Sequence, residues 1–249
     1  LRTLRPIAEY IDKAVERVWT PMPAWFGHTT EEIVKEILLS KSPDNLISFL
    51  RSDGFCKIKG RLYYGRRHTL PADKKIIIMS ATASPRLYEL ACPGRQLHVH
   101  RIAPAIPEGE LIQYFNKSWS RGSLKNVIEK DQDTLDFLAS TIEDHPDIVL
   151  ITFKGYKDEI LECGLPVAEE LHFGKVEGLN DMVKGDLGVV GTPHLPAIDY
   201  WLWAVLLDLK PGPFERRQWT PVVVVRNGYE FKFPVCSDNS DLQEIQLHR

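Results

Sequence analysis

Hydroxyl side chains follow an apolar run in the first half of the chain. Ser80, Thr82 and Ser84 come directly after Lys74–Met79, whose centre is three consecutive isoleucines. An uninterrupted β-branched run predicts a strand that is buried on both faces of a parallel sheet. Pro85 then favours the start of a helix. Because open α/β sheets bind ligands at the carboxyl ends of their strands, these hydroxyls are candidates for ligand binding. The alternative is a Ser/Thr helix cap.

A second group of candidates lies in a segment whose chemistry is basic and aromatic. Residues 55–68 alternate in polarity around a central glycine, which predicts a β-hairpin. Its cations are Lys57, Lys59, Arg61, Arg66 and Arg67, and Tyr63 and Tyr64 stand among them. Such a ribbon can follow phosphates and stack on bases. The alternative is a charged, solvated edge that protects a sheet from aggregation.

Two further apolar runs, DIVLITF and LGVV, predict buried strands at 147–153 and 187–190. The first is followed by Lys154-Gly155 and the second by Gly191-Thr192. Strands alternate with helical patterns in this part of the chain, which predicts a parallel α/β sheet with right-handed crossovers. A simple strand-ending turn at Gly191-Thr192 is the alternative to a functional site.

The elements that must position these residues fall into four expected regions. Residues 1–102 contain a helical insert, the basic hairpin and the isoleucine run, and 103–110 form a linker rich in proline. Residues 111–210 form an α/β domain, and 211–249 form an extension with a second hairpin around Asn227-Gly228. Further strands are expected at 96–102, 111–115 and 170–173.

Composition restricts the function classes. The net charge of −3 means that nucleic-acid contact must come from a local patch. The four cysteines form no CxxC pair, which argues against a zinc site or disulfides and suits a reducing, cytoplasmic compartment. Trp201–Leu209 is too short to span a bilayer, so no membrane partner is expected. His98 and His100 share a strand face but have no third ligand nearby, so we expect no metal site.

Three segments in order carry a family resemblance. Ser80-Ala81-Thr82, DIVLITFKG at 147–155 and LGVVGTP at 187–193 resemble motifs III, IV and V of superfamily 2 DEAD/DEAH-like helicases. GELIQY, SWSRGSL, HFGKVEGLN and RNGYEFKF are similar to stretches of the phage and bacterial branch of these helicases. The resemblance covers residues 50–249. It implies the end of a first RecA-like domain in 1–102 and a second RecA-like, helicase C-terminal domain in 111–210.

The family mechanism implies roles for these residues. Two RecA-like domains clamp ATP, and motif III couples that site to nucleic acid, so Ser80, Ala81 and Thr82 are expected to carry interdomain coupling. Motifs IV and V hold the strand, which implies nucleic-acid contact at Phe153, Lys154 and Gly155. For Gly191 and Thr192 the resemblance implies contact with either the nucleic-acid backbone or the nucleotide ribose. Single-stranded DNA is the favoured partner. Residues 80–82 and 191–192 are expected to face each other across a shared groove.

Several family motifs are absent from this sequence. There is no GxxxxGK[ST] loop for the nucleotide phosphates, no DEAD or DExH box for magnesium, and no Gln…Gly-Arg-x-x-Arg motif VI. We therefore expect a fragment whose missing motifs lie before Leu1 and after Arg249, with no catalytic residue of its own. ATP and magnesium would be bound by the parent enzyme, which includes the missing N-terminal RecA-like half. The alternative is a degenerate helicase-like module that only binds nucleic acid or a partner protein.

Overall fold

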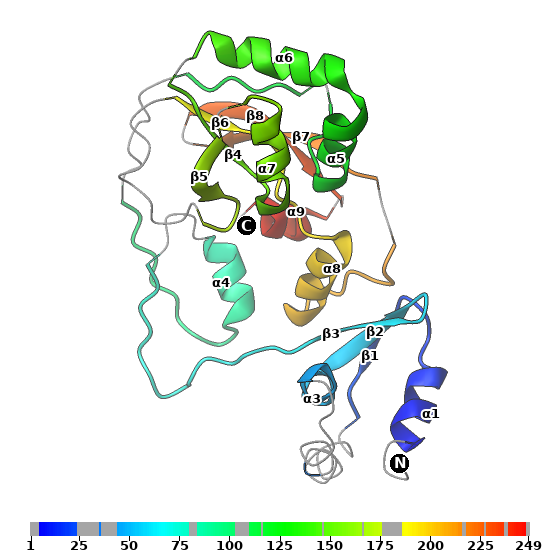
Figure 1. Ribbon diagram of the computed structural model, residues 1–249. Coiled ribbons are helices and arrows are strands. Elements are labelled where there is room, and N and C mark those ends of the chain that lie inside the picture. The colour runs from blue at the N-terminus through cyan, green and yellow to red at the C-terminus, as the bar shows by residue number, and fades with distance from the viewer. Residues whose placement is uncertain are drawn as a thin grey trace. The chain divides into compact units, whose positions relative to one another are not determined.

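The computed structural model describes most of the chain as two compact units (Figure 1). The first comprises Leu1–Gly109 with Pro196–Arg249, and the second comprises Glu110–Leu195. The described residues are 5–23, 35, 44–79, 84–102, 110–115, 117–145, 147–165, 167–175, 186–215, 218–226, 228–236 and 239–247. Ser80, Ala81 and Thr82 lie outside these ranges, and so do residues 103–109 of the expected linker. The expected groove between 80–82 and 191–192 therefore stays a prediction.

The first unit contains a three-stranded antiparallel sheet in the order β1-β2-β3. Its strands are β1 (Trp19–Pro21), β2 (Gly54–Ile58) and β3 (Arg61–Gly65). Lys59 and Gly60 form the turn between β2 and β3, and both have positive φ, 48° and 74°. The predicted basic hairpin is thus confirmed, and β1 extends it to a third strand. Because β2 is central, Phe55 and Cys56 are both fully buried, one on each face.

Helices cover both faces of this sheet. On one face α1 (Arg5–Lys13) and α3 (Asp44–Leu50) pack around Phe55, and on the other α8 (Ala197–Leu206) packs around Cys56. Burial raises the pKa of the Cys56 thiol to about 11, so it behaves as an apolar group. The sequence prediction placed the α8 segment with residues 111–210, whereas α8 lies in the first unit, because its apolar side chains pack against β2 and β3.

The same unit contains a second hairpin and two further helices. β7 (Thr220–Arg226) and β8 (Tyr229–Val235) pair antiparallel, which confirms the hairpin predicted around residue 228. α4 (Pro85–Ala91) begins at the proline that predicted it, with Ser84 as its N-cap. α9 (Ser240–Leu247) packs against α8, β8 and α4.

Three strand predictions are wrong. Residues 74–79, 96–102 and 111–115 have no regular secondary structure, and all three segments are exposed. Ile77 is 80% exposed and Met79 is 93% exposed, so the isoleucine run is not a doubly buried strand. A strand needs a neighbour for its backbone N–H and C=O groups, and no described strand pairs with these segments.

The second unit is a small parallel α/β structure. Its sheet has the order β5-β4-β6, with both pairs parallel, as predicted. The predicted burial of the strand at 187–190 is wrong for Leu187 and Val189, which are exposed because β6 pairs with β4 alone in the described sheet. The elements are α5 (Arg121–Lys130), α6 (Gln132–Glu143), β4 (Val149–Thr152), the 3-10 turn η1 (Lys154–Tyr156), α7 (Lys157–Glu162), β5 (Val167–His172) and β6 (Leu187–Val189). One core joins Leu124 of α5, Ile142 of α6, Leu150 of β4 and Ile160 of α7. The chain is therefore a mixed α/β protein with one parallel and two antiparallel sheets in its described part.

No helix in the described ranges combines the length and the apolar character that crossing a bilayer requires.

Candidate nucleic-acid interface

The carboxyl ends of β4, β5 and β6 meet at one edge of the parallel sheet. The backbone N–H of Phe173, after β5, donates to the carbonyl of Thr152 at 3.1 Å. The N–H of Val190, after β6, donates to the carbonyl of Ile151 at 2.9 Å. The parallel pairing thus brings Phe153–Gly155 and Gly191-Thr192, which are far apart in sequence, to the same edge of the second unit.

Gly191 lies against two aromatic rings at this edge. A Cβ on Gly191 would stand 2.7 Å from Cε2 of Phe153 and 3.0 Å from Cε2 of Phe173. The two rings are 5.0 Å apart at an interplanar angle of 65°, which is an edge-to-face contact. The φ of Gly191 is 129°, a value that favours glycine. Steric space and backbone conformation therefore both require glycine here.

The segment before α5 lies beside the loop after β6. The backbone N–H of Thr192 donates to the carbonyl of Trp119 at 2.8 Å. Ser120 caps α5 by accepting from the N–H of Ser123 at 3.3 Å. The Ser123 hydroxyl in turn donates to Ser118 Oγ at 3.2 Å. These serines hold the start of α5 next to the Gly191-Thr192 loop.

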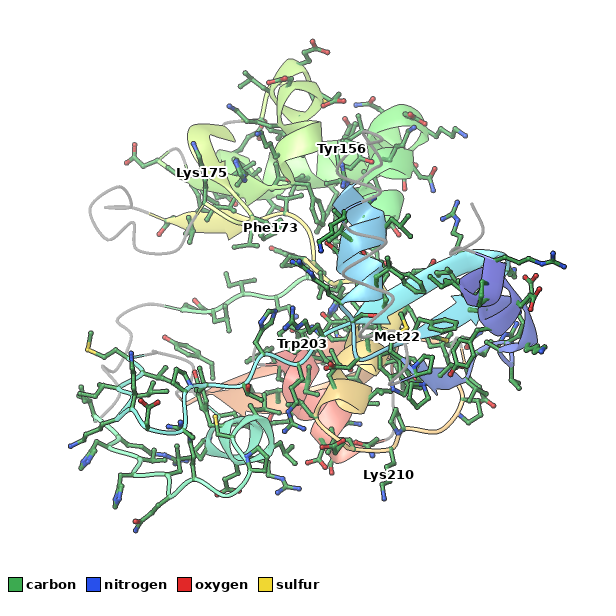
Figure 2. All side chains as sticks on the ribbon, turned by 90° about the horizontal axis from the view of Figure 1, so that it is seen from below. Met22, Tyr156, Phe173, Lys175, Trp203 and Lys210 are labelled. Atoms are coloured by element: carbon green, nitrogen blue, oxygen red, sulfur yellow. The ribbon has the colours of Figure 1, made fainter. Side chains whose placement is uncertain are left out.

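Cations and aromatic rings surround the same edge. Lys154 and Gly155 are exposed in η1, directly after β4. The ring of Tyr156 lies edge-to-face with that of Phe153, with centroids 6.5 Å apart. Lys175 is exposed in the turn that follows β5, and Figure 2 shows it close to Phe173. The edge can therefore offer ammonium groups, exposed backbone and a hydroxyl to a phosphate chain.

Two side chains that are close in sequence to the residues of this edge, Thr152 and His194, have buried polar atoms. Thr152 is fully buried at the end of β4, and its Oγ1 has no hydrogen-bond partner within the described part of the chain. Burial lowers the pKa of His194 to about 4, because the charged imidazolium is poorly solvated there. The His194 imidazole is therefore neutral near pH 7 and adds no positive charge to the loop.

In the first unit, the basic hairpin divides into cations with and without internal partners. Lys57 Nζ donates to the carbonyls of Ile11 at 3.3 Å and Asp12 at 3.1 Å, near the end of α1. The Arg67 guanidinium binds Asp208 at 2.7 Å and the carbonyl of Leu90 at 2.8 Å. These two side chains connect elements of the fold.

Lys59, Arg61 and Arg66 differ from the other two cations of the hairpin. Their side chains are exposed and form no ion pair with any residue in the described ranges. Tyr64 packs against Phe49 at 5.6 Å and donates to the carbonyl of Asn45, and Tyr63 packs against the α8 side of the sheet. The hairpin therefore presents charge more than free aromatic faces. Its nucleic-acid contact stays a prediction.

Sequence reasoning missed the contributions of Phe173, Tyr156 and Arg121 to the edge. Arg121 Cζ lies 5.8 Å from the centroid of the Tyr156 ring. No local pattern connects these residues, because their contacts depend on which loops the parallel sheet brings together. The sequence analysis named the stretches SWSRGSL and HFGKVEGLN, which contain Arg121 and Phe173, but assigned neither residue a role.

Comparisons with protein-family models, with curated proteins and with solved structures found no match to this chain.

Proposed function

We propose that this chain is the C-terminal portion of an ATP-dependent superfamily 2 DEAD/DEAH-like helicase or translocase. In this proposal the second unit is the core of its second RecA-like domain and contributes strand binding. One observation carries the proposal: the motif IV-like Phe153–Gly155 and the motif V-like Gly191-Thr192 lie together at the carboxyl edge of a parallel sheet. Ligands of open α/β sheets bind at this edge.

The chemistry of the edge supports a single-stranded nucleic acid as the ligand. Lys154 and Lys175 supply positive charge, and the partly buried Thr192 supplies a hydroxyl. Charge and hydroxyl groups hold a phosphate backbone without reading its sequence. The partly exposed rings of Phe153 and Phe173 supply apolar surface, which suits bases that are not already paired.

The sequence has no GxxxxGK[ST] loop for the nucleotide phosphates. In this proposal ATP and magnesium are bound by the parent enzyme. The expected role of this chain is to hold the strand, with interdomain coupling at Ser80–Thr82.

Binding of labelled DNA tests this proposal. Fluorescence anisotropy of a single-stranded oligonucleotide and its duplex would be measured across a range of salt concentrations. We expect tighter binding of the single strand. We also expect Lys154→Ala to reduce the slope of log affinity against log salt by about 0.7, the loss of one phosphate contact. Lys130→Ala is the matched control, because Lys130 is exposed at the C-terminal end of α5, whereas the N-terminal end of α5 lies beside the Gly191-Thr192 loop.

Two results would contradict the proposal. The first is a failure of the wild-type chain to bind single-stranded DNA, or an equal change in binding in the Lys154→Ala and Lys130→Ala variants. The second is ATP hydrolysis by this chain alone at ordinary enzyme rates, which would place the nucleotide site within it.

A further inference from the structure

We infer that Arg121 is a phosphate-binding residue of this edge and that Tyr156 and Gly155 hold its guanidinium in position. This inference rests on the proposed function and gives a role to a residue to which the family resemblance assigned none. Its ligand is a phosphate group of the single strand. The geometry of three contacts leads to it.

The first contact is between Arg121 and Tyr156. The guanidinium carbon lies 5.8 Å from the ring centroid, within the range of a cation–π interaction. A guanidinium that lies on an aromatic ring keeps the N–H donors at its rim available. Tyr156 is itself fixed, because its ring packs edge-to-face on Phe153 and its N–H donates to the Phe153 carbonyl at 3.0 Å.

The second contact explains the glycine after Lys154. A Cβ on Gly155 would lie 3.1 Å from Nη2 of Arg121, which is closer than most side-chain contacts. Gly155 is not among the residues with positive φ, so its backbone conformation does not by itself demand glycine. The absence of a side chain at 155 therefore provides room for the guanidinium over η1.

The third contact fixes the backbone of Arg121. It is the first residue of α5, and the cap formed by Ser120 and Ser123 orders that turn. Trp119, two residues earlier, is tied to the N–H of Thr192 at 2.8 Å. Arg121 thus stands between the motif V-like loop and η1, where a bound strand would pass in the proposed function.

The charge of Arg121 is available for a ligand. The side chain is exposed, and none of the described carboxylates forms an ion pair with it. Arg67 and Arg86 differ, since each pairs with an aspartate of the protein. A guanidinium that is positioned but not neutralised provides bidentate binding of a phosphate.

The test compares three variants with wild type in the single-stranded DNA binding assay, at several salt concentrations. We expect Arg121→Ala to weaken binding about tenfold, the size of one hydrogen-bonded charge contact, and to reduce the salt slope by about 0.7. Gly155→Ala keeps every charge but adds a Cβ 3.1 Å from Nη2 of Arg121, so the guanidinium must shift by a few tenths of an ångström and we expect weaker binding with an unchanged salt slope. Lys130→Ala removes a charge from the far end of the same helix and is expected to bind like wild type.

Circular dichroism and thermal unfolding confirm that each variant is folded before binding is measured. If wild type does not bind the strand, the proposed function fails and the inference fails with it. If wild type binds and Arg121→Ala or Gly155→Ala binds equally well, the inference alone is overturned. Loss of affinity in both, with Lys130→Ala unaffected, supports it.

Discussion

Gly191→Ala is expected to destabilise the second unit more than Gly164→Ala or Gly122→Ala. Its φ of 129° lies in a region that side chains rarely adopt, and a Cβ there would stand 2.7 Å from the Phe153 ring. Backbone strain contributes about 1–3 kcal/mol and overpacking a further 1–3 kcal/mol, so we expect a total loss of about 2–6 kcal/mol. Phe153 cannot rotate away cheaply, because it packs on the core that contains Leu150.

Two glycines of the same unit are matched controls. Gly164 also has positive φ, 81°, but a Cβ there meets no atom within 4 Å. Gly164→Ala therefore isolates backbone strain, with an expected cost of about 1–2 kcal/mol. Gly122 lies within α5 with open space around it, so Gly122→Ala is expected to stabilise by about 0.5–1 kcal/mol through helix propensity.

Hydrogen exchange during urea titration measures these effects unit by unit. Peptides that contain β4 (Val149–Thr152) report on the second unit, and peptides that contain β2 and β3 report on the first unit as an internal reference. We expect the protection of the β4 amides to decrease in the order Gly122→Ala, wild type, Gly164→Ala, Gly191→Ala. The protection of the β2 and β3 amides is expected to be the same in all four proteins. If Gly191→Ala costs no more than Gly164→Ala, the packing of Phe153 and Phe173 against this glycine is refuted.

Three further predictions concern separate parts of the molecule. Lys57→Ala should lower the free energy of unfolding of the first unit by about 1 kcal/mol, because its hydrogen bonds to α1 are lost. Arg61→Ala should leave urea unfolding unchanged, because its side chain is exposed. Equal effects of the two substitutions would refute the distinction between these two cations. His194 has a pKa lowered from 6.5 to about 4, so the unfolded state binds more protons between these values. Stability of the second unit should therefore fall as pH falls through that window, and His194→Asn should flatten the dependence measured by urea unfolding. The Ser84 hydroxyl donates to the Glu244 carboxylate at 2.7 Å. Glu244→Ala should therefore speed amide hydrogen exchange in α4 and leave amide exchange in β2 unaffected. Unchanged exchange in α4 would show that this hydrogen bond does not stabilise the helix.

Local sequence patterns were sufficient for elements whose stability comes from short-range geometry. Pro85 predicted the start of α4, alternation predicted the β2–β3 hairpin, and the apolar runs ending at Phe153 and Val190 predicted β4 and β6. α4, the hairpin and β4 depend on fixed dihedral angles, turn residues and burial of one continuous run. A single sequence contains that information. β6 forms as predicted, but the prediction that it is buried is wrong for Leu187 and Val189, which are 46% and 57% exposed.

The same patterns were insufficient where a partner decides the outcome. The run Lys74–Met79 contains three β-branched residues, the same number as β4, yet it forms no strand, since no described strand accepts its backbone hydrogen bonds. The α8 segment was assigned to the domain at 111–210, whereas it packs on the sheet of the first unit, because apolar residues on several sides of a helix do not indicate which surface they cover.

Side-chain roles depended most strongly on tertiary structure. Lys57 and Arg61 are chemically similar neighbours in one ribbon, but only Lys57 reaches the carbonyls near the end of α1. Arg121 reaches the Tyr156 ring, and Gly191 meets the Phe153 and Phe173 rings, only because folding brings remote parts of the second unit to a single edge. Residue types and local periodicity are encoded along the chain, whereas distances between remote side chains exist only after the sheet has formed.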